Sequence, residues 1–600
     1  MSRSIAVVVF STLLLAIPPL ALLSAENSHA RYLIPRRSSQ IHDGFGINSD
    51  LPRDPFIPWN RRWWTRMFDA GVNFVRIGQY ENSSDYTSWE WVERKRGEYS
   101  VVPDLDDYVD SLVENGVHIE IQLLYGNPLY TSPSGRPLTS VVPKAGGFHN
   151  PDRSLYSIFW PPKTDEQIRA FTKYVSWMVN HFRGRAEYYE IWNEPNIEYW
   201  NPAPNPEGYG KLFKASAAAI HGTDPKAKTV FGGLAGADVD FAKRALDACD
   251  CAAAIDVFAY HNYPDYGHNL NPEATHEHAD TNASSKPLRD MVHNYPGIRK
   301  EIVFWDDEFN DGIPSWTNSD ESVQAKYIPR GLIIDRAEGV RTFVWLIVGA
   351  TNGNESDDFG MLHGLMFRPD DFKPRPAYSA LRNTNTLFSD THVDFSTKVE
   401  SEAAVLSEQP RFYSFRSSEG KAIIAYWVPV LSEPGDQFAR LKITLRITGS
   451  GIRNPVLVDV RSGEIRDLSW RPGTSDTLES LPLTDSVLAI TDQSFFDWPE
   501  LPEVPSDLNA TNARGRVELT WKMHEGHPQS VSVEQRIGRK GRWELRSKLP
   551  GRAASFTDTR APAGEDEVFY RVRAENGSGA SAYSNVAELG WEAFKDLRKK

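Results

Sequence analysis

The chain has 600 residues, which is too many for one hydrophobic core, so two to four domains are expected. Acidic residues outnumber basic ones by 80 to 66, and no long run of lysine and arginine occurs. Because phosphate binding needs clustered basic side chains, nucleic acid is excluded as the main partner. Aromatic residues make up 12% of the chain, which suits core packing and also clefts that bind flat sugar faces.

Residues 1–30 have the pattern of a signal peptide. Arg3 provides a positive charge, an apolar stretch runs from Ile5 to Leu23, and small residues for cleavage follow at Ser28-His29-Ala30 or at Ala25. The alternative is an uncleaved membrane anchor, but Pro18 and Pro19 disfavour a spanning helix. We therefore expect a secreted or periplasmic protein, with no stable membrane insertion after cleavage.

Residues 31–385 alternate short apolar runs with helical patterns, which indicates βα units around a parallel sheet. Eight such runs over about 300 residues predict an α/β fold of the TIM barrel type, (β/α)8. The predicted strands are residues 44–47, 74–77, 118–123, 188–192, 229–232, 256–260, 302–305 and 342–345.

The chain has two cysteines, Cys249 and Cys251, separated by one residue. This spacing is too close for an easy disulfide, and two cysteines alone make a poor metal site. We expect two small, half-buried side chains, and stability that comes from burial alone.

Two all-β regions are predicted after the barrel. Period-two patterns in residues 386–498 indicate a β-sandwich, and Pro499, Pro502 and Pro505 indicate a linker. In residues 503–590, the strands Val517–Trp521 and Phe569–Ala574 resemble the B and F strands of a fibronectin type III module. That resemblance implies a second β-sandwich, of a kind that often serves as a spacer, and no chemistry is assigned to it.

The fourth predicted strand ends in Trp192-Asn193-Glu194-Pro195. Active sites of (β/α)8 barrels lie at the carboxyl ends of the strands, so the Glu194 carboxylate is expected at the barrel mouth. Asn193 is placed to donate a hydrogen bond to a sugar hydroxyl. The alternative for this segment is a helix-capping pair at a turn.

The seventh predicted strand ends in Asp306-Asp307-Glu308. Strand alternation would put Asp306 and Glu308 on one face, with Glu308 further toward the mouth. Glu308 is therefore the predicted nucleophile and Asp306 the alternative. Three adjacent acids are also compatible with a solvated acidic loop.

Glu194 and Glu308 together form the pair that glycoside hydrolysis requires, one carboxylic acid to protonate the leaving oxygen and one carboxylate to attack the anomeric carbon. The acid needs a raised pKa, and the nucleophile must stay ionised. Arg76, at the end of the second strand, could keep it ionised through charge and a hydrogen bond. A purely structural ion pair is the alternative for Arg76.

Further candidates follow other strands of the barrel. Tyr263 is placed to hydrogen-bond the nucleophile and His261 to bind a sugar hydroxyl, although a lone histidine is often structural. Trp345, at the end of the eighth strand, is predicted to form the floor of the sugar subsite, with a core position as the alternative. The remaining predicted cleft residues are Tyr125, Asn127 and Trp200.

The segment Tyr189–Asn196 resembles the fourth-strand motif of clan A glycoside hydrolases, and of family 39 in particular. Tyr199–Pro202 and Asp224–Ala227 continue the likeness, and Tyr125–Tyr130 resembles the third-strand loop of members that cut bacterial exopolysaccharides. The resemblance implies a retaining double displacement, with Glu194 as acid/base and Glu308 as nucleophile, acting on a poly- or oligosaccharide. The family includes β-xylosidases, α-L-iduronidases and exopolysaccharide hydrolases, so the resemblance leaves the sugar open.

Two other functions fit the same residues. One is a polysaccharide-binding protein on an inactive barrel, which the presence of both acids disfavours, and the other is a transglycosylase. The chain lacks the Gly-x-Ser-x-Gly and His-Glu-x-x-His motifs of esterases and metalloproteases. Since double displacement needs no metal, we expect neither a metal site nor a cofactor.

Overall fold

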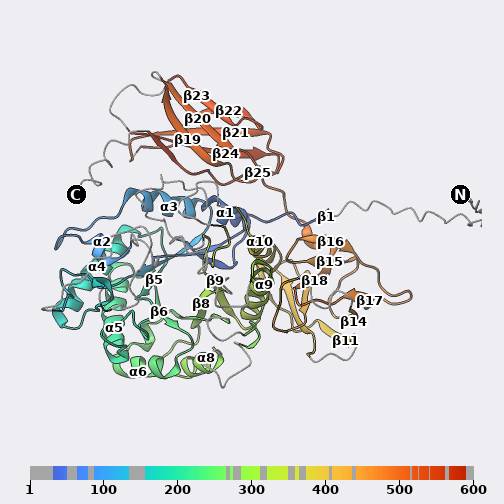
Figure 1. The fold of residues 1–600 in the computed structure, drawn as a ribbon, viewed down its shortest axis with the longest axis horizontal. Helices are drawn as coiled ribbons and strands as arrows, with labels where there is room; N and C mark the ends of the chain where they lie inside the picture. The colour runs from blue at the N-terminus through green and yellow to red at the C-terminus, as the bar shows by residue number, and fades with distance from the viewer. Residues whose placement is uncertain are drawn as a thin grey trace, which may run out of the picture.

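The computed structural model describes residues 31–49, 64–78, 87–133, 154, 156–264, 270–274, 285–310, 320–348, 359–363, 373–403, 408–435, 441–513, 516–524, 526–539, 541–560 and 567–589. The predicted signal peptide, residues 1–30, lies outside this part of the chain. Figure 1 shows three bodies, namely a barrel, a β-sandwich beside it and a smaller group of sheets packed on one side.

Eight parallel strands close into a barrel in chain order, as the sequence predicts, and β2 closes it by pairing with β9. All eight predicted apolar runs form these strands. The barrel strands are β2 (Gly46–Asn48), β3 (Phe74–Ile77), β4 (His118–Leu123), β5 (Tyr188–Ile191), β6 (Lys228–Ala235), β7 (Val257–His261), β8 (Val303–Phe309) and β9 (Val340–Val344).

Helices cover the outside of the barrel, and their ends follow capping rules. Before α4, the Thr164 side chain accepts a hydrogen bond from the backbone N–H of Gln167, and the Gln167 side chain accepts one from the backbone N–H of Thr164. The helices used below are α1 (Trp64–Asp69), α3 (Pro103–Glu114), α4 (Asp165–His181), α5 (Pro206–Thr223), α6 (Val239–Cys249), α8 (Lys286–His293), α9 (Glu321–Ala337) and α10 (Pro376–Phe388).

The inside of the barrel is layered. Near the amino ends of the strands, an apolar cluster including Phe74, Trp305 and Phe343 fills the interior. Further along the same strands, inward positions are polar or charged and still buried, as at Arg76 and Glu190. The apolar layer therefore closes the barrel from below, and the polar layer lies directly beneath the mouth.

A β-sandwich follows the barrel, with a seven-stranded sheet in the order β1-β16-β15-β18-β13-β12-β10 and a three-stranded sheet β11-β14-β17. Residues 31 and 32, predicted to belong to the barrel domain, instead form β1 and pair with β16. The strands are β1 (Arg31–Tyr32), β10 (Thr391–Val393), β11 (Lys398–Ala403), β12 (Arg411–Ser417), β13 (Ala422–Trp427), β14 (Lys442–Thr448), β15 (Pro455–Asp459), β16 (Glu464–Asp467), β17 (Thr477–Pro482) and β18 (Leu488–Asp492).

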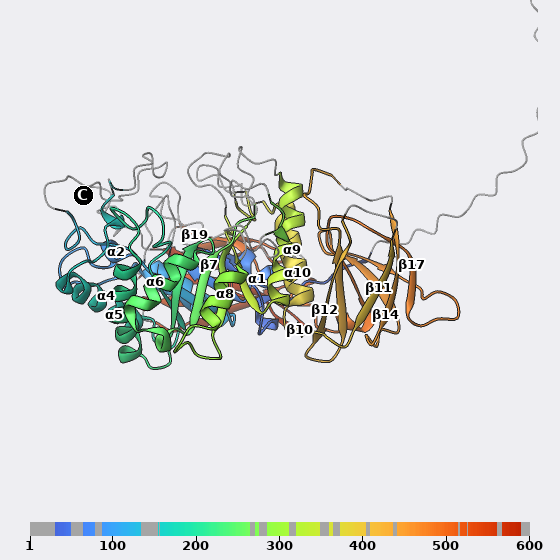
Figure 2. The same cartoon turned by 90° about the horizontal axis from the view of Figure 1, so that it is seen from below.

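The seven-stranded sheet contributes to two cores. Alternate residues of β13 point to opposite faces, so Ile423 and Trp427 join the core of the barrel while Ile424 and Tyr426 join the core of the sandwich. Figure 2 shows α9 and α10 between the barrel and this sheet. The sandwich thus shares a core with the barrel and is not a loosely tethered module.

The last group of sheets is compatible with a β-sandwich and packs on the barrel. Arg571 donates to both carboxylate oxygens of Glu114 on α3, at 2.9 and 2.8 Å, and Arg536 lies 2.9 Å from Asp107 on the same helix (Figure 1). The strands are β19 (Ser506–Ala513), β20 (Arg516–Lys522), β21 (Ser530–Ile537), β22 (Glu544–Pro550), β23 (Ser555–Asp558), β24 (Val568–Asn576), β25 (Gly579–Ala580) and β26 (Ala587–Leu589).

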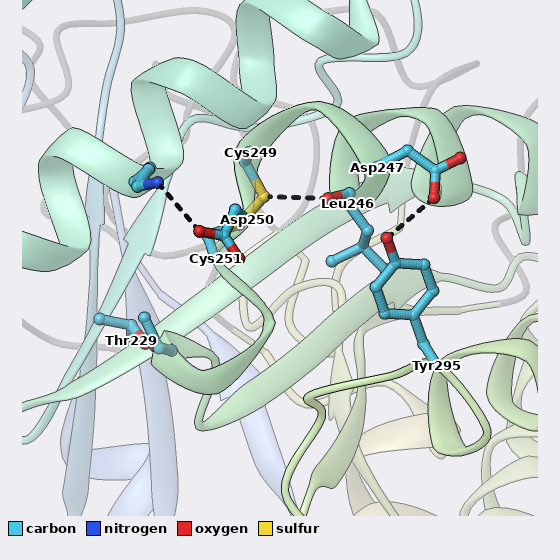
Figure 3. Close-up of a disulfide and its surroundings, with 9 residues drawn as sticks. Thr229, Leu246, Asp247, Cys249, Asp250, Cys251 and Tyr295 are labelled. Carbon is cyan, nitrogen blue, oxygen red and sulfur yellow. Dashed lines mark hydrogen bonds and ion pairs between the residues drawn. A yellow bond between two sulfur atoms is a disulfide. The ribbon is translucent and has the colours of Figure 1, made fainter.

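The expectation that the two cysteines stay unpaired is wrong, because Cys249 and Cys251 form a disulfide (Figure 3). Asp250 ends α6 in the left-handed conformation, with φ of 47°. This turn folds the chain back and brings the two Cα atoms to 5.1 Å, within the range that a disulfide spans. Spacing in the sequence did not reveal this turn.

None of the helices in the described part of the chain combines the length and the apolar character that a membrane span requires.

Candidate active site

Glu194 stands on a strained turn at the end of β5. Trp192 and Glu194 both adopt positive φ, 68° and 46°, a region that residues other than glycine rarely occupy. The backbone N–H of Glu194 donates to the carbonyl oxygen of Gly233 on β6 at 2.8 Å, which holds the turn in place. Such strain is typical of functional sites, where the surrounding structure supports an unusual conformation.

Asn193 lies beneath Glu194, fully buried. Its Oδ1 accepts hydrogen bonds from Arg76 at 2.8 Å and from Gln122 at 3.1 Å. Its Nδ2 has no hydrogen-bond partner among the described residues. A buried donor without a partner next to a carboxylate fits the predicted role of Asn193 in binding a hydroxyl group.

A β-bulge at the end of β8 changes the predicted orientation of the three acids. Asp306 pairs with Thr342 and Phe309 pairs with Val344, so β8 carries one more residue than β9 over this stretch. The simple alternation that would place Asp306 and Glu308 on the same face therefore does not hold.

The side chains of β8 therefore do not alternate between the two faces of the strand as predicted. Trp305 belongs to the apolar cluster inside the barrel, and Asp307 also points inward, toward Arg76. Asp306 faces the other way and accepts the backbone N–H of Asn262 at 3.0 Å. Glu308, displaced by the bulge, contacts Arg76 and Tyr263.

Arg76 connects the acidic groups of the site. One nitrogen, Nη1, donates to Glu308 Oε1 at 2.6 Å and to Asn48 Oδ1 at 3.0 Å. Nε and Nη2 donate to the two oxygens of Glu190 at 2.8 and 3.1 Å, and Nη2 also reaches Asn193. The predicted contact between Arg76 and the carboxylate at position 308 is therefore present, with Glu190 as a second partner.

Tyr263 and His261 complete the contacts of the two glutamates. The Tyr263 hydroxyl donates to Glu308 Oε2 at 2.9 Å, as predicted. His261 was expected to bind a sugar hydroxyl, but it lies between the two carboxylates. Its Nδ1 is 2.8 Å from Glu194 Oε1 and 3.4 Å from Glu308 Oε2. His261 is only 1% exposed, and its expected contact with a sugar hydroxyl stays a prediction.

Burial dominates the proton affinities of these groups. It raises the pKa of Glu308 above its usual range, and the positive charge of Arg76 partly opposes the rise. Burial lowers the pKa of His261 to about 3, so the imidazole is neutral at ordinary pH. Burial and the neighbouring Glu308 raise the pKa of Tyr263, which stays a phenol and can keep donating its hydrogen bond.

Sequence reasoning missed three acids beneath the mouth, Glu120, Glu190 and Asp307. All three are buried inside the barrel. The sequence does contain an indication of these acids, because Glu120 and Glu190 lie within otherwise apolar strands. Strands of a parallel barrel are covered by protein on both faces, so a charged residue within one is buried. Charged residues inside such strands indicate a buried polar interior.

Two sets of side chains lie close enough to hold a metal ion, Glu190 with His261 and Asp307, and Glu194 with His261 and Glu308. However, Arg76 already brings a positive charge to Glu190 at 2.8 Å, to Asp307 at 3.6 Å and to Glu308 at 2.6 Å. We interpret both sets as an ion-paired network around Arg76.

Three predicted cleft residues are buried in the barrel wall. Tyr125 packs against Trp192, and Trp200 also packs against Trp192 from another side. Asn127 donates to two backbone carbonyls and holds a loop. All are at most 3% exposed, so this structure gives them packing and loop-holding roles. Trp345 follows β9 and is half-buried, so a role as subsite floor stays a prediction.

Residues 95–347 match the family model described as glycosyl hydrolases family 39. The chain carries a glycosidase domain. The match spans β4 to β9 and includes Glu194 and Glu308 at the mouth of the barrel. A carbohydrate is therefore the substrate class of this glycosidase domain. No curated protein matches the sequence significantly.

Three solved structures are similar to this chain, and the first of them supports its barrel fold. A family 39 glycoside hydrolase from the gut symbiont Bacteroides cellulosilyticus WH2 is 19% identical, with a TM-score of 0.55 over 76% of this chain and 82% of that one. A bacterial orthologue of human α-L-iduronidase is 15% identical, with a TM-score of 0.48 over 93% and 98%. A family 39 β-xylosidase from Caulobacter crescentus is 15% identical, with a TM-score of 0.47 over 77% and 98%.

Proposed function

We propose that the protein is a secreted retaining glycoside hydrolase that cleaves O-glycosidic bonds in a polysaccharide or oligosaccharide by double displacement. Glu194 is the general acid/base and Glu308 the nucleophile. The main support for the proposal is the distance between the two carboxylates. Oxygen atoms of Glu194 and Glu308, on β5 and β8, lie within 4.8 Å of each other. This short separation favours retention, because inverting enzymes keep their carboxyl groups about 6.5–9.5 Å apart to admit a water molecule.

In the first step, a Glu308 oxygen attacks the anomeric carbon while Glu194 gives its proton to the leaving oxygen. The glycosidic C–O bond breaks and a glycosyl ester of Glu308 forms. In the second step, Glu194 takes a proton from water, whose oxygen attacks the same carbon and releases Glu308. Arg76 and Tyr263 both hold Glu308 before attack, and together they orient its two oxygens.

Export of the enzyme is supported by the sequence pattern of residues 1–30. The Cys249–Cys251 disulfide agrees with an oxidising compartment outside the cytoplasm. For the last domain we propose a fibronectin type III module, which is supported by its two sheets, β19-β20-β23 and β22-β21-β24-β25. Its contacts with α3 fit a fixed structural role beside the barrel.

The proposal is tested on a panel of aryl glycosides and polysaccharides with single variants. Glu194→Gln should lower kcat/KM roughly 10²–10⁴-fold on substrates with poor leaving groups, since general acid catalysis is lost. With added azide, Glu308→Ala should form a glycosyl azide of inverted configuration, whereas Glu194→Ala should form the retained one.

Asp306→Ala is the matched comparison, because Asp306 is the alternative nucleophile two residues away. The assignment is wrong if azide rescues Asp306→Ala with inversion and Glu308→Ala keeps its activity. If wild type turns over no substrate but binds a polysaccharide tightly, the protein is a binding protein. If it only transfers sugar to other sugars, it is a transglycosylase.

A further inference from the structure

Asn310 is a buried side chain directly after β8, two residues beyond Glu308. Its Nδ2 donates to the backbone carbonyl oxygen of Trp345 and, at 2.6 Å, to that of Phe359. Its Oδ1 accepts a hydrogen bond from Nε2 of Gln324 at 3.3 Å. Because carbonyl oxygens can only accept, they fix the amide with Nδ2 on their side. Asn310 thus joins two segments of the chain that are 14 residues apart in sequence.

The two segments that Asn310 joins lie beside each other at the end of β9. The N–H group of Met361 donates to the carbonyl oxygen of Leu346 at 3.0 Å. One residue further along each segment, the N–H group of Leu362 donates to the carbonyl oxygen of Ile347 at 2.9 Å. Asn310 caps this short pairing from the side of β8, so its amide holds both backbones at one point.

Phe359 transmits this support to the predicted nucleophile. The ring of Phe359 meets the ring of Tyr263 edge-on, with centroids 6.0 Å apart and an interplanar angle of 72°. The hydroxyl of Tyr263 in turn donates to Oε2 of Glu308 at 2.9 Å. A continuous line of contacts therefore leads from the Asn310 amide, through the backbone and ring of Phe359, to one oxygen of Glu308.

Asn310 is itself held by α9, the helix between the barrel and the β-sandwich (Figure 2). Gln324 on this helix is fully buried, and its Nε2 also lies 3.3 Å from the carbonyl oxygen of Phe359. Two residues along the helix, Lys326 pairs with Asp485 of the sandwich at 2.8 Å. The element that fixes Asn310 is thus anchored on both of its sides.

We propose that Asn310 is a positioning residue for the nucleophile. It fixes the backbone at Phe359, whose ring holds Tyr263 where the Tyr263 hydroxyl reaches Glu308. A reacting group is placed accurately only when packing and hydrogen bonds lock the side chains around it, and a displacement of about 1 Å is costly in rate. This inference rests on the proposed function of Glu308, and Asn310 acts without touching the substrate.

Hydrogen–deuterium exchange tests the holding role without any substrate. Asn310→Leu keeps the size of the side chain and removes both donated hydrogen bonds. The segments should then separate more often, and exchange at the N–H groups of Met361 and Leu362 should be at least about tenfold faster than in wild type. Unchanged exchange in a folded Asn310→Leu protein would overturn the proposal.

Kinetics on the aryl glycoside that wild type hydrolyses fastest test the positioning role. Asn310→Leu should lower kcat roughly tenfold, because Tyr263 no longer holds Glu308 in place. In a Tyr263→Phe background, which already lacks the hydroxyl, the same change should cost at most about twofold. Equal losses in the two backgrounds would show that Asn310 does not act through Tyr263.

Asn383→Leu is the matched control. Asn383 on α10 is also buried, and its Nδ2 donates to the backbone carbonyl oxygens of Val460 and Arg461 at 3.0 and 3.5 Å, away from the two glutamates. Both Leu variants should lower the thermal unfolding temperature, but Asn383→Leu should leave kcat within about twofold of wild type and the exchange at Met361 and Leu362 unchanged. An equal loss of kcat in the control would assign the effect to general destabilisation.

Phe359→Leu is a second variant, which serves if Asn310→Leu does not fold. It removes the ring contact with Tyr263 and keeps the Asn310 hydrogen bonds to the backbone. It should lower kcat roughly fivefold alone and at most about twofold with Tyr263→Phe, and equal losses would again reject the route. If wild type hydrolyses no glycoside, the proposed function fails, while the exchange measurement still decides whether Asn310 holds the two segments.

Discussion

At the scale of single residues, the charge of Arg76 favours the ionised form of Glu308. Burial raises the pKa of Glu308, and Arg76, 2.6 Å away, lowers it. Arg76→Gln removes the lowering charge, so the pKa rises further and the ionised fraction falls at acidic pH. We expect the acidic limb of kcat/KM to move to higher pH by about one unit or more.

The pH profile of hydrolysis measures this shift. Arg185→Gln is the control, since it removes a cation that pairs with Asp106 and Asp110 outside the site, and it should leave the limb in place. An unchanged acidic limb in a folded Arg76→Gln protein would show that Arg76 does not keep the nucleophile ionised.

At the scale of elements, β6 can pass beside Glu190 because residue 233 is a glycine. Gly233 has φ of 57°, and a Cβ atom there would lie 1.9 Å from Glu190 Oε1. Gly233→Ala should displace Glu190 from Arg76 and lower kcat/KM at least about tenfold, since misplaced catalytic groups lose rate steeply.

Gly184→Ala is a matched control, because Gly184 also has positive φ, 77°, but has open space around the added methyl group. Both variants should lose about 1–2 kcal/mol of stability from the left-handed backbone. Only Gly233→Ala should lose activity, as measured by kinetics beside thermal unfolding. Equal activity of the two variants would mean that Gly233 matters only for folding.

At the scale of the whole molecule, a buried ion pair joins α9 to the β-sandwich. Lys326 pairs with Asp485 at 2.8 Å, with both side chains fully buried, and Arg330 on the same helix pairs with Glu273. Lys326→Met leaves Asp485 buried without its partner, and we expect a loss of about 3–5 kcal/mol in the free energy of unfolding.

Urea denaturation measures this loss. The comparison is Lys421→Met, which breaks the more exposed pair with Glu419 and should cost at most about 1 kcal/mol. Similar losses for the two variants would contradict a stabilising role for the buried pair.

Much of the fold and part of the site could be predicted from residue patterns. Each barrel strand is a short apolar run, and a run of this kind is visible without tertiary information. Glu194 and Glu308 could be predicted because both directly follow such runs, and Arg76 and Tyr263 because they lie near the ends of β3 and β7. The contacts of Arg76 and Tyr263 with Glu308 are present in the structure.

Several features were not predictable in this way. The disulfide depends on the left-handed turn at Asp250, and the separation of Asp306 from Glu308 depends on the bulge in β8. Tyr125 and Trp200 resembled cleft residues because aromatic residues serve both clefts and cores. Only their contacts with Trp192 place them in the wall of the barrel.

The sequence by itself determined the order of the strands, the ends of β5 and β8 as the places for the two glutamates, and the all-β character of the chain after the barrel. These depend on local periodicity and on chain order, which the sequence contains. Only the tertiary structure decided that His261 lies between Glu194 and Glu308, that Asp307 faces Arg76, and that β1 joins the sandwich. Those facts depend on distances of a few ångströms between strands remote in sequence, and a bulge of one residue is enough to change them.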